Sequence, residues 1–217
     1  QAFLGFQSGV IDPEDFDDPN NTAYFGNAIY NRVNQDYYQE TSGYNSKFTM
    51  NFATQYLDVL YIGGSMNFHS IYYENYTQFS ERGYDADSPI GFTNFDNLLV
   101  TRGNGFSFNL GMIARVNEAI RLGASYQSPT WYDLTDDFSQ RINTDFPDKN
   151  TDITFIDFNI VNLFPGYSIK TPGKFNGGLA LVFGANGLLS FDYSYQDMSN
   201  AELRPTSDPS FATVNSE

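Results

Sequence analysis

The sequence predicts an all-β protein and, more specifically, an antiparallel transmembrane β-barrel. Apolar and polar residues alternate with a period of two along most of the chain, as they do in strands with one apolar face. Short connections alternate with long, polar, acidic ones, and no stretch carries an amphipathic helical stripe longer than a turn or two. Tight turns at one end and long loops at the other are typical of an up-and-down barrel in an outer membrane.

Composition and charge narrow the function classes. The chain has 217 residues, with 11 Lys and Arg against 26 Asp and Glu and a formal net charge of -15. No basic cluster is present to bind phosphates, which argues against a nucleic-acid partner. Because there is no cysteine and only 1 histidine, disulfides, cysteine zinc sites and multi-histidine metal sites are excluded. No run approaches 18 consecutive apolar residues, so a helical membrane span is excluded as well.

Several segments carry the alternation that predicts a strand. In chain order they are 3–11, where the alternation is weak, 47–56, 62–69, 106–116, 119–127, 174–183 and 189–196. In 106–116, for example, Phe106 and Leu110 share one face, while Ser107 and Asn109 share the other. The chain therefore contains about seven or eight strands, depending on how residues 151–165 are counted.

The connections separate into two classes. The short ones are Leu57-Asp58-Val59, Asn117-Glu118 and Gly184-Ala185-Asn186-Gly187. The long ones are 12–46, roughly 82–97, 142–152 and the region from 197 onward. A strand from Asn97 to Val116 would be roughly 65 Å long at about 3.3 Å per residue. Since the bilayer core is only about 30 Å thick, we expect the strands to project beyond the membrane.

A soluble β-sandwich or jelly roll with an aromatic-rich binding surface is the alternative that the same alternation allows. The positions of several aromatic residues favour the barrel. Tyr56 and Tyr61 lie at a short turn, and Trp131 and Tyr132 lie toward long loops. Tyrosine and tryptophan prefer the two membrane interfaces, where the ring is in an apolar layer and its polar atom stays hydrated.

Two blocks of sequence resemble the FadL/TodX family of outer-membrane transporters for hydrophobic compounds, in its Bacteroidetes-type form. Within 119–139 the chain reads Arg-Leu-Gly-Ala-Ser-Tyr-Gln-Ser-Pro-Thr, followed by an aromatic pair and Thr-Asp-Asp. Within 170–198 it has Lys-Thr-Pro-Gly, a tight turn and Ser-Phe-Asp-Tyr-Ser-Tyr-Gln-Asp. The resemblance implies a fourteen-stranded barrel with an N-terminal hatch in its lumen. It also implies that long-chain fatty acids or other apolar compounds bind near the outer mouth and leave sideways through a strand kink.

The chain departs from the family pattern in two places. The Asn-Pro-Ala motif of the hatch does not occur in it, and its last residues, Asn215-Ser216-Glu217, lack the C-terminal aromatic residue of this class of barrels. We therefore expect residues 1–217 to be a single β-barrel domain from the middle of a larger chain, without the hatch and the terminal strands.

Alternation gives a set of candidate ligand-binding residues on the face that would line the lumen. They are Asn67, His69, Ile113, Arg115, Arg121 and Gln127. His69 is expected to be a packed, hydrogen-bonded residue, with a proton-linked role as the alternative. Arg115 and Arg121 flank a short turn. They are expected to pair with carboxylates in the lumen, and contact with a fatty-acid carboxylate is the alternative.

Three other motifs indicate a function less specifically. Asp15, Asp17 and Asp18 belong to an acidic stretch that either is a solvated loop or binds a divalent cation, which could bridge to lipopolysaccharide. The stretch lacks the spacing of an EF-hand loop. Pro129 and Pro172 each predict a strand end, a bulge or a bend, with a gate as the functional alternative. The segment Gly103-Asn104-Gly105 predicts a bulge or kink, because it leads into a strand and not into a helix.

These observations predict a channel in the bacterial outer membrane for passive uptake of long-chain fatty acids or other hydrophobic small molecules. No nucleophile elbow is present, so the expected protein is not an enzyme, and no cofactor is expected. The expected partners are the transported molecule, outer-membrane lipid and lipopolysaccharide. One alternative is a FadL-like barrel that serves as a subunit of an outer-membrane assembly, such as a PorV-type protein of a secretion complex. The other is the soluble binding module.

Overall fold

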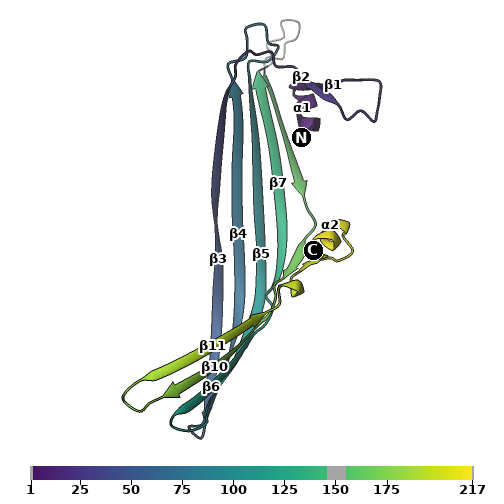
Figure 1. The fold of residues 1–217 in the computed structure, drawn as a ribbon. Helices are drawn as coiled ribbons and strands as arrows, with labels where there is room; N and C mark the ends of the chain where they lie inside the picture. The colour runs from purple at the N-terminus through teal and green to yellow at the C-terminus, as the bar shows by residue number, and fades with distance from the viewer. Residues whose placement is uncertain (1, 146–154, 217) are drawn as a thin grey trace. The chain divides into compact units, whose positions relative to one another are not determined.

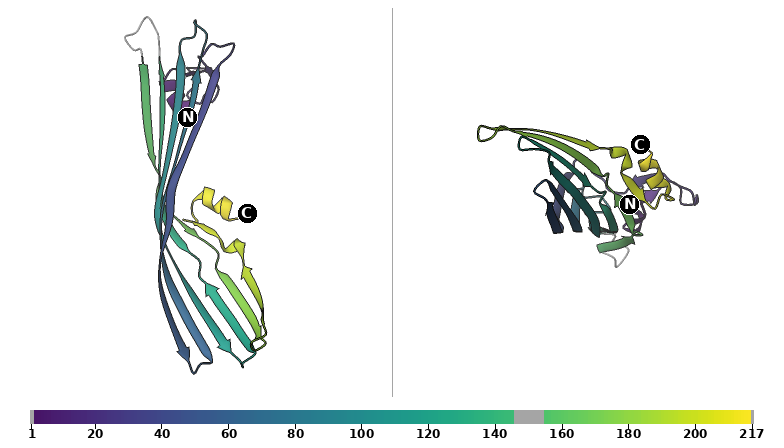
Figure 2. Two further views of the ribbon diagram at one scale, coloured as in Figure 1. Left: turned by 90° about the vertical axis from the view of Figure 1, so that its left-hand side faces the viewer. Right: turned by 90° about the horizontal axis from the view of Figure 1, so that it is seen from below.

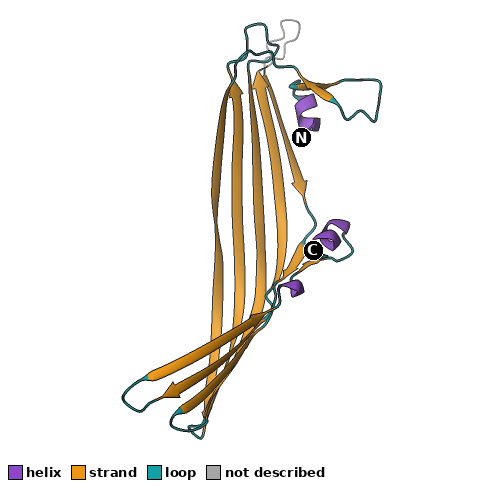
Figure 3. Cartoon of the chain, viewed as in Figure 1, coloured by secondary structure: helices purple, strands orange, loops and turns teal. Residues whose placement is uncertain are grey.

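The computed structural model describes residues 2–145 and 155–216, and antiparallel strands make up most of them (Figure 1). This confirms the all-β prediction. Helices are confined to three short segments, α1 (Ala2–Gln7), η1 (Met198–Asn200) and α2 (Pro209–Asn215) (Figure 3). In the part of the chain that the structure describes, no helix is long and apolar enough to cross a bilayer.

The main sheet has ten strands. They are β3 (Asn34–Tyr56), β4 (Leu60–Arg82), β5 (Phe92–Arg115), β6 (Ile120–Gln127), β7 (Trp131–Asp145), β8 (Phe155–Leu163), β9 (Tyr167–Lys170), β10 (Lys174–Val182), β11 (Leu188–Gln196) and β12 (Glu202–Arg204). A separate hairpin joins β1 (Ile11–Pro13) to β2 (Tyr24–Gly26). Among the described residues β3 pairs only with β4, and β11 ends the order at the other side, so the sheet is open and a closed barrel is not formed by these strands alone.

The pairing follows sequence order from β3 to β6, and beyond β6 it includes strands that are not consecutive in the chain. β3 pairs with β4 and β4 with β5, and β5 pairs with both β6 and β7. β6 pairs next with β10, and β7 pairs with β8 and β9. β11 then pairs with β10, and β12 with β9 (Figure 2). Two consecutive strands, β6 and β7, thus lie along the same strand, β5, and each pairs on its other side with a later strand.

Several expected boundaries need correction. The segment 3–11 is not a strand: residues 2–7 form α1, because Leu4 and Ser8 lie one helical turn apart, are both buried and are joined by the Ser8 N–H to Leu4 carbonyl hydrogen bond of 3.0 Å. The long loop expected over 12–46 ends at Asn34, and the one expected near 82–97 ends at Phe92, where β3 and β5 begin. β7 extends to Asp145, and the rest of the expected loop 142–152 lies outside the described residues.

The expected strand length is confirmed, since β3 and β4 have 23 residues each and β5 has 24. The chain divides into two compact units. Unit 1 comprises Gln1–Gly43, Tyr73–Thr101 and Asp136–Phe164, and unit 2 comprises Tyr44–Tyr72, Arg102–Thr135 and Pro165–Glu217. The long strands contribute residues to both units, and each unit is described here by itself.

Unit 1 has polar side chains on both faces of its strands. On one face Gln78 donates to Asp96 (3.0 Å), and Arg141 donates to both carboxylate oxygens of Asp157 (2.8 and 2.6 Å). These bonds from Arg141 lower the pKa of the Asp157 carboxyl. On the other face Gln140 donates to Asn97 at 2.8 Å. A two-sided polar strand pattern of this kind fits strands with water on both faces.

The turn between β3 and β4 has an unusual backbone. Leu57 and Asp58 have φ of 50° and 52°, and the Val59 N–H donates to the Tyr56 carbonyl at 3.1 Å. Two central residues with positive φ define a type I′ turn, which favours Asn and Gly and disfavours leucine.

We expect Leu57→Asn to raise the free energy of unfolding by about 0.5–1 kcal/mol, because asparagine adopts this conformation at lower cost. Urea unfolding of the purified chain measures the change. Val59→Asn is the control, since Val59 is outside the positive-φ pair and should gain nothing. A loss of stability in Leu57→Asn would contradict the turn assignment.

Candidate functional site

Unit 2 has one apolar face, and its side chains are exposed. They occupy alternate positions on six strands, as the sequence predicted, and include Phe48, Met50, Phe52, Ile62, Met66, Phe68, Phe106, Leu110, Met112, Leu122, Phe175, Leu189, Phe191, Tyr193 and Tyr195. Phe52 is 65% exposed and Leu110 55% exposed. The described residues of unit 2 leave this apolar face uncovered.

The opposite, polar face of unit 2 is joined by hydrogen bonds between strands. Asn67, only 2% exposed, accepts from Thr49 (2.9 Å) and donates to Ser107 (3.3 Å). His69 Nε2 lies 3.1 Å from the Ser107 hydroxyl, and His69 Nδ1 lies 3.4 Å from the Tyr132 hydroxyl. These bonds connect four strands, and Asn67 and Ser107 are each only 2% exposed.

A second set of bonds crosses the same face. Asn109 donates to Ser65 and Asn176 donates to Ser125, both at 3.0 Å. Asn176 in turn accepts from Ser194 at 2.7 Å. The side-chain oxygen of Asn109 is buried and accepts no hydrogen bond in the described structure.

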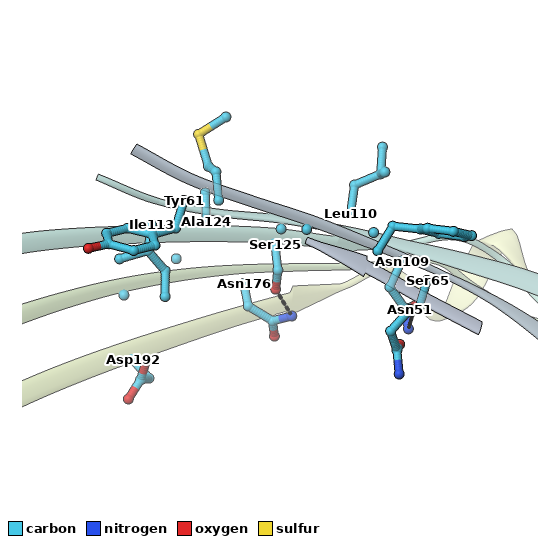
Figure 4. Close-up of a pocket in the computed structure, with 18 residues that line it drawn as sticks. Asn51, Tyr61, Ser65, Asn109, Leu110, Ile113, Ala124, Ser125, Asn176 and Asp192 are labelled. Atoms are coloured by element: carbon cyan, nitrogen blue, oxygen red, sulfur yellow. Dashed lines mark hydrogen bonds between the residues drawn. The ribbon is translucent and has the colours of Figure 1, made fainter. Parts of the chain in front are cut away.

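Glycines from four strands surround a concave region of about 580 Å³. Gly63, Gly111, Gly123 and Gly178 of the polar face and Gly64 and Gly177 of the apolar face line it. We call this region the trough. Its other lining residues are Asn51, Tyr61, Ser65, Asn109, Ile113, Ser125, Asn176 and Asp192 of the polar face and Phe52, Leu110, Met112 and Ala124 of the apolar face. In Figure 4 Leu110 points to one side of the strands, while Asn51, Asn176 and Asp192 point to the other.

Gly111 and Gly123 leave space and are not required by close packing. A Cβ added at Gly111 would come no closer than 3.7 Å to another atom, and one at Gly123 no closer than 3.9 Å, which are ordinary contacts. At Gly178 the nearest atom would be an Asp192 carboxylate oxygen at 2.9 Å. Larger side chains at 111 and 123 would therefore fill the trough without a backbone clash.

A row of aromatic side chains crosses unit 2. Its ring centroids are separated by 4.6 to 6.5 Å along the series Phe68, Phe106, Trp131, Phe108, Tyr126 and Phe175. These residues come from five strands. A row of this kind is typical of the aromatic girdle at a membrane interface.

The two prolines expected at strand ends are at strand ends. Pro129 lies between β6 and β7, and Pro172 lies between β9 and β10. The two breaks are neighbours, because the Thr171 N–H donates to the Thr130 carbonyl (3.0 Å) and the Thr130 N–H donates to the Thr171 hydroxyl (2.9 Å). Two adjacent strands are thus interrupted at the same level, which removes part of the ladder there.

The segment 103–105 packs closely against a neighbouring strand. It lies inside the continuous strand β5, and its glycines allow close approach of β7. A Cβ at Gly103 would lie 2.3 Å from the Asp133 carbonyl oxygen, and a Cβ at Gly105 would lie 2.5 Å from the Tyr132 ring.

The six candidate residues all lie on the polar face of unit 2, but in four places. Asn67 and His69 belong to the hydrogen-bond network, and Ile113 lines the trough. Arg115 and Arg121 oppose each other directly in the register of β5 and β6. Gln127 is exposed and opposes Asn109 and Lys174.

Sequence reasoning missed the trough glycines. A signal for them was present, since glycine recurs at positions where alternation expects a polar side chain. The acidic candidates lie elsewhere: Asp15 and Asp18 accept backbone N–H bonds from Asp17 and Asn20 at 2.9 Å, in local turns. Over residues 2–145 and 155–216, no group of three or more histidine or acidic side chains is placed to hold a metal ion.

No protein-family model matches this chain, and no curated protein does. The resemblance to the FadL/TodX family therefore depends on the blocks 119–139 and 170–198 alone.

Proposed function

We propose that unit 2 is part of the wall of a transmembrane β-barrel in a bacterial outer membrane. One observation carries the proposal: the apolar side chains of unit 2 are exposed, while polar side chains such as Asn67 and Ser107, each 2% exposed, are buried and hydrogen-bonded. A protein surrounded by water has the opposite arrangement. A barrel strand in lipid alternates apolar residues outward and polar residues inward.

The extent of the apolar face supports the same proposal. On β5 the apolar positions run from Phe106 to Ala114, which is about 27 Å along a strand at roughly 3.4 Å per residue. Membrane-spanning strands need about 9–11 residues. The aromatic row begins at the Phe106 end of this run, where an interface is expected.

The proposed activity is passive passage of long-chain fatty acids or other hydrophobic small molecules along the polar face. The trough supports this activity. It is open, and its glycines leave part of the surface without side chains. Amide groups and the carbon atoms of Tyr61 and Ile113 line the rest. Such a surface suits a narrow molecule with an apolar chain and a polar head. No bond is made or broken in this process.

The assay is uptake of radiolabelled oleate by Gram-negative cells that lack their own fatty-acid channel and export the chain from an added secretion signal. We expect the chain in the outer-membrane fraction and uptake several-fold above that of cells with an empty vector. Membrane insertion without uptake, together with stable co-purifying proteins, would favour the assembly subunit instead. A chain that stays in solution without detergent would contradict both barrel hypotheses and favour the soluble module.

A further inference from the structure

Two arginines face each other on adjacent strands. Arg115, the last residue of β5, pairs directly with Arg121 of β6. Directly opposed residues in an antiparallel pair have Cβ atoms about 4.5–5.5 Å apart. The preceding pair on the same face is Ile113 with Gly123, and both of these residues line the trough. The arginine pair therefore lies at one end of the trough.

Neither arginine has a carboxylate partner among the residues that the structure describes. Over residues 2–145 and 155–216, no ion pair and no side-chain hydrogen bond joins Arg115 or Arg121 to an acidic residue. Glu118 lies three residues from each in the connecting turn, yet it pairs with neither. The sequence-based expectation that these arginines pair with lumen carboxylates is thus not met within the described structure. Like charges that oppose each other destabilise a sheet, and a bound anion would remove that repulsion.

The surroundings leave room for an anion. Arg121 is exposed and Arg115 is half-buried. Across the next strands the opposing residues are small: Arg121 opposes Ala180, and Ala180 opposes Ser190, whose hydroxyl could donate a further hydrogen bond. No large side chain from these two strands lies opposite the guanidinium groups.

We propose that Arg115 and Arg121 bind the oxyanion headgroup, carboxylate or phosphate, of a single-chain amphiphile whose tail lies in the trough. Guanidinium groups present paired N–H donors that match the oxygens of both headgroups. The trough next to the two arginines has space for a narrow alkyl chain, because glycines line it. The inference rests on the proposed function, because it names the class of molecule that the polar face takes and the residues that recognise it.

Equilibrium dialysis of the full chain in a non-ionic detergent tests this inference. The probes are radiolabelled dodecanoate, dodecyl phosphate and dodecanol. We expect dodecanoate to bind about tenfold more tightly than dodecanol, because only the carboxylate forms charge-assisted hydrogen bonds. The relative affinities of dodecanoate and dodecyl phosphate then show which headgroup the site prefers.

The double variant Arg115→Gln/Arg121→Gln should bind dodecanoate and dodecanol within about twofold of each other. It should unfold at the same temperature as the parent chain or a higher one, because the repulsion is gone. Lys174→Gln removes one charge from the same face and should keep the tenfold preference. An equal loss in Lys174→Gln, or equal binding of both probes to the parent chain, would overturn the arginine site and leave the proposed function standing. No binding of any probe would overturn both.

Discussion

Replacement of Leu110 by arginine is expected to prevent accumulation of the chain in the outer membrane. Leu110 lies near the middle of the apolar run on β5 and is 55% exposed. If that face contacts lipid, an arginine there costs about 2–4 kcal/mol at the bilayer midplane. A loss of this size is a large part of the stability of a typical domain, so most of the variant should fail to assemble.

Gln127→Arg is the matched control for Leu110→Arg. Gln127 is exposed on the polar face and opposes Asn109, the neighbour of Leu110 in the chain. The same side chain introduced there would face water and should leave the amount of chain in the outer-membrane fraction within about twofold of the parent. Equal accumulation of both variants would mean that the apolar face is not in lipid.

The second large effect is expected when the trough is filled. In Gly111→Phe the new ring enters the trough, because a Cβ at this position meets no atom closer than 3.7 Å and the chain can fold around it. Oleate uptake by cells that export this variant should fall by about tenfold or more, since a narrowed path blocks passage.

Leu122→Phe separates blockage of the trough from a general effect of an added ring. Leu122 lies on β6, is 47% exposed and does not line the trough. Its register partners, Ala114 and Leu179, place it on the apolar face. This variant should take up oleate like the parent chain. If Gly111→Phe retains full uptake while it is present in the outer membrane, the trough is not on the transport path.

Most of the fold of unit 2 could be predicted because its strands have two different faces. Alternation identified both the elements and their apolar sides, for example in β5 and β6. In the first part of β3, polar residues such as Gln39 and Thr41 do not alternate with apolar ones. The extension of β3 to Asn34 could therefore not be predicted from alternation. That part of β3 is joined to β4 by side-chain bonds from Gln39 and Thr41 to Asn75, each 3.1 Å long.

The candidate site was predicted in part. Alternation placed Arg115 and Arg121 on the same face, but only the register shows that they oppose each other directly. The trough needs the alignment of glycines from four strands, and the two proline breaks need the alignment of β6 and β7 with β9 and β10. Alignment across strands depends on turn geometry and strand length together, which a single sequence does not specify.

The central claim is that the apolar face of unit 2 contacts lipid and its polar face contacts water. Since the chain has no cysteine, single cysteines can be placed at successive positions of β5 and labelled with nitroxide without background. In vesicles, we expect collisions with oxygen to dominate at 106, 108, 110 and 112, and collisions with a water-soluble nickel complex to dominate at 109, 111 and 113. At 94–99, in unit 1, both sets of positions should be accessible to nickel. Accessibility to the nickel complex at 106, 108, 110 and 112, with no period of two along β5, would contradict the claim.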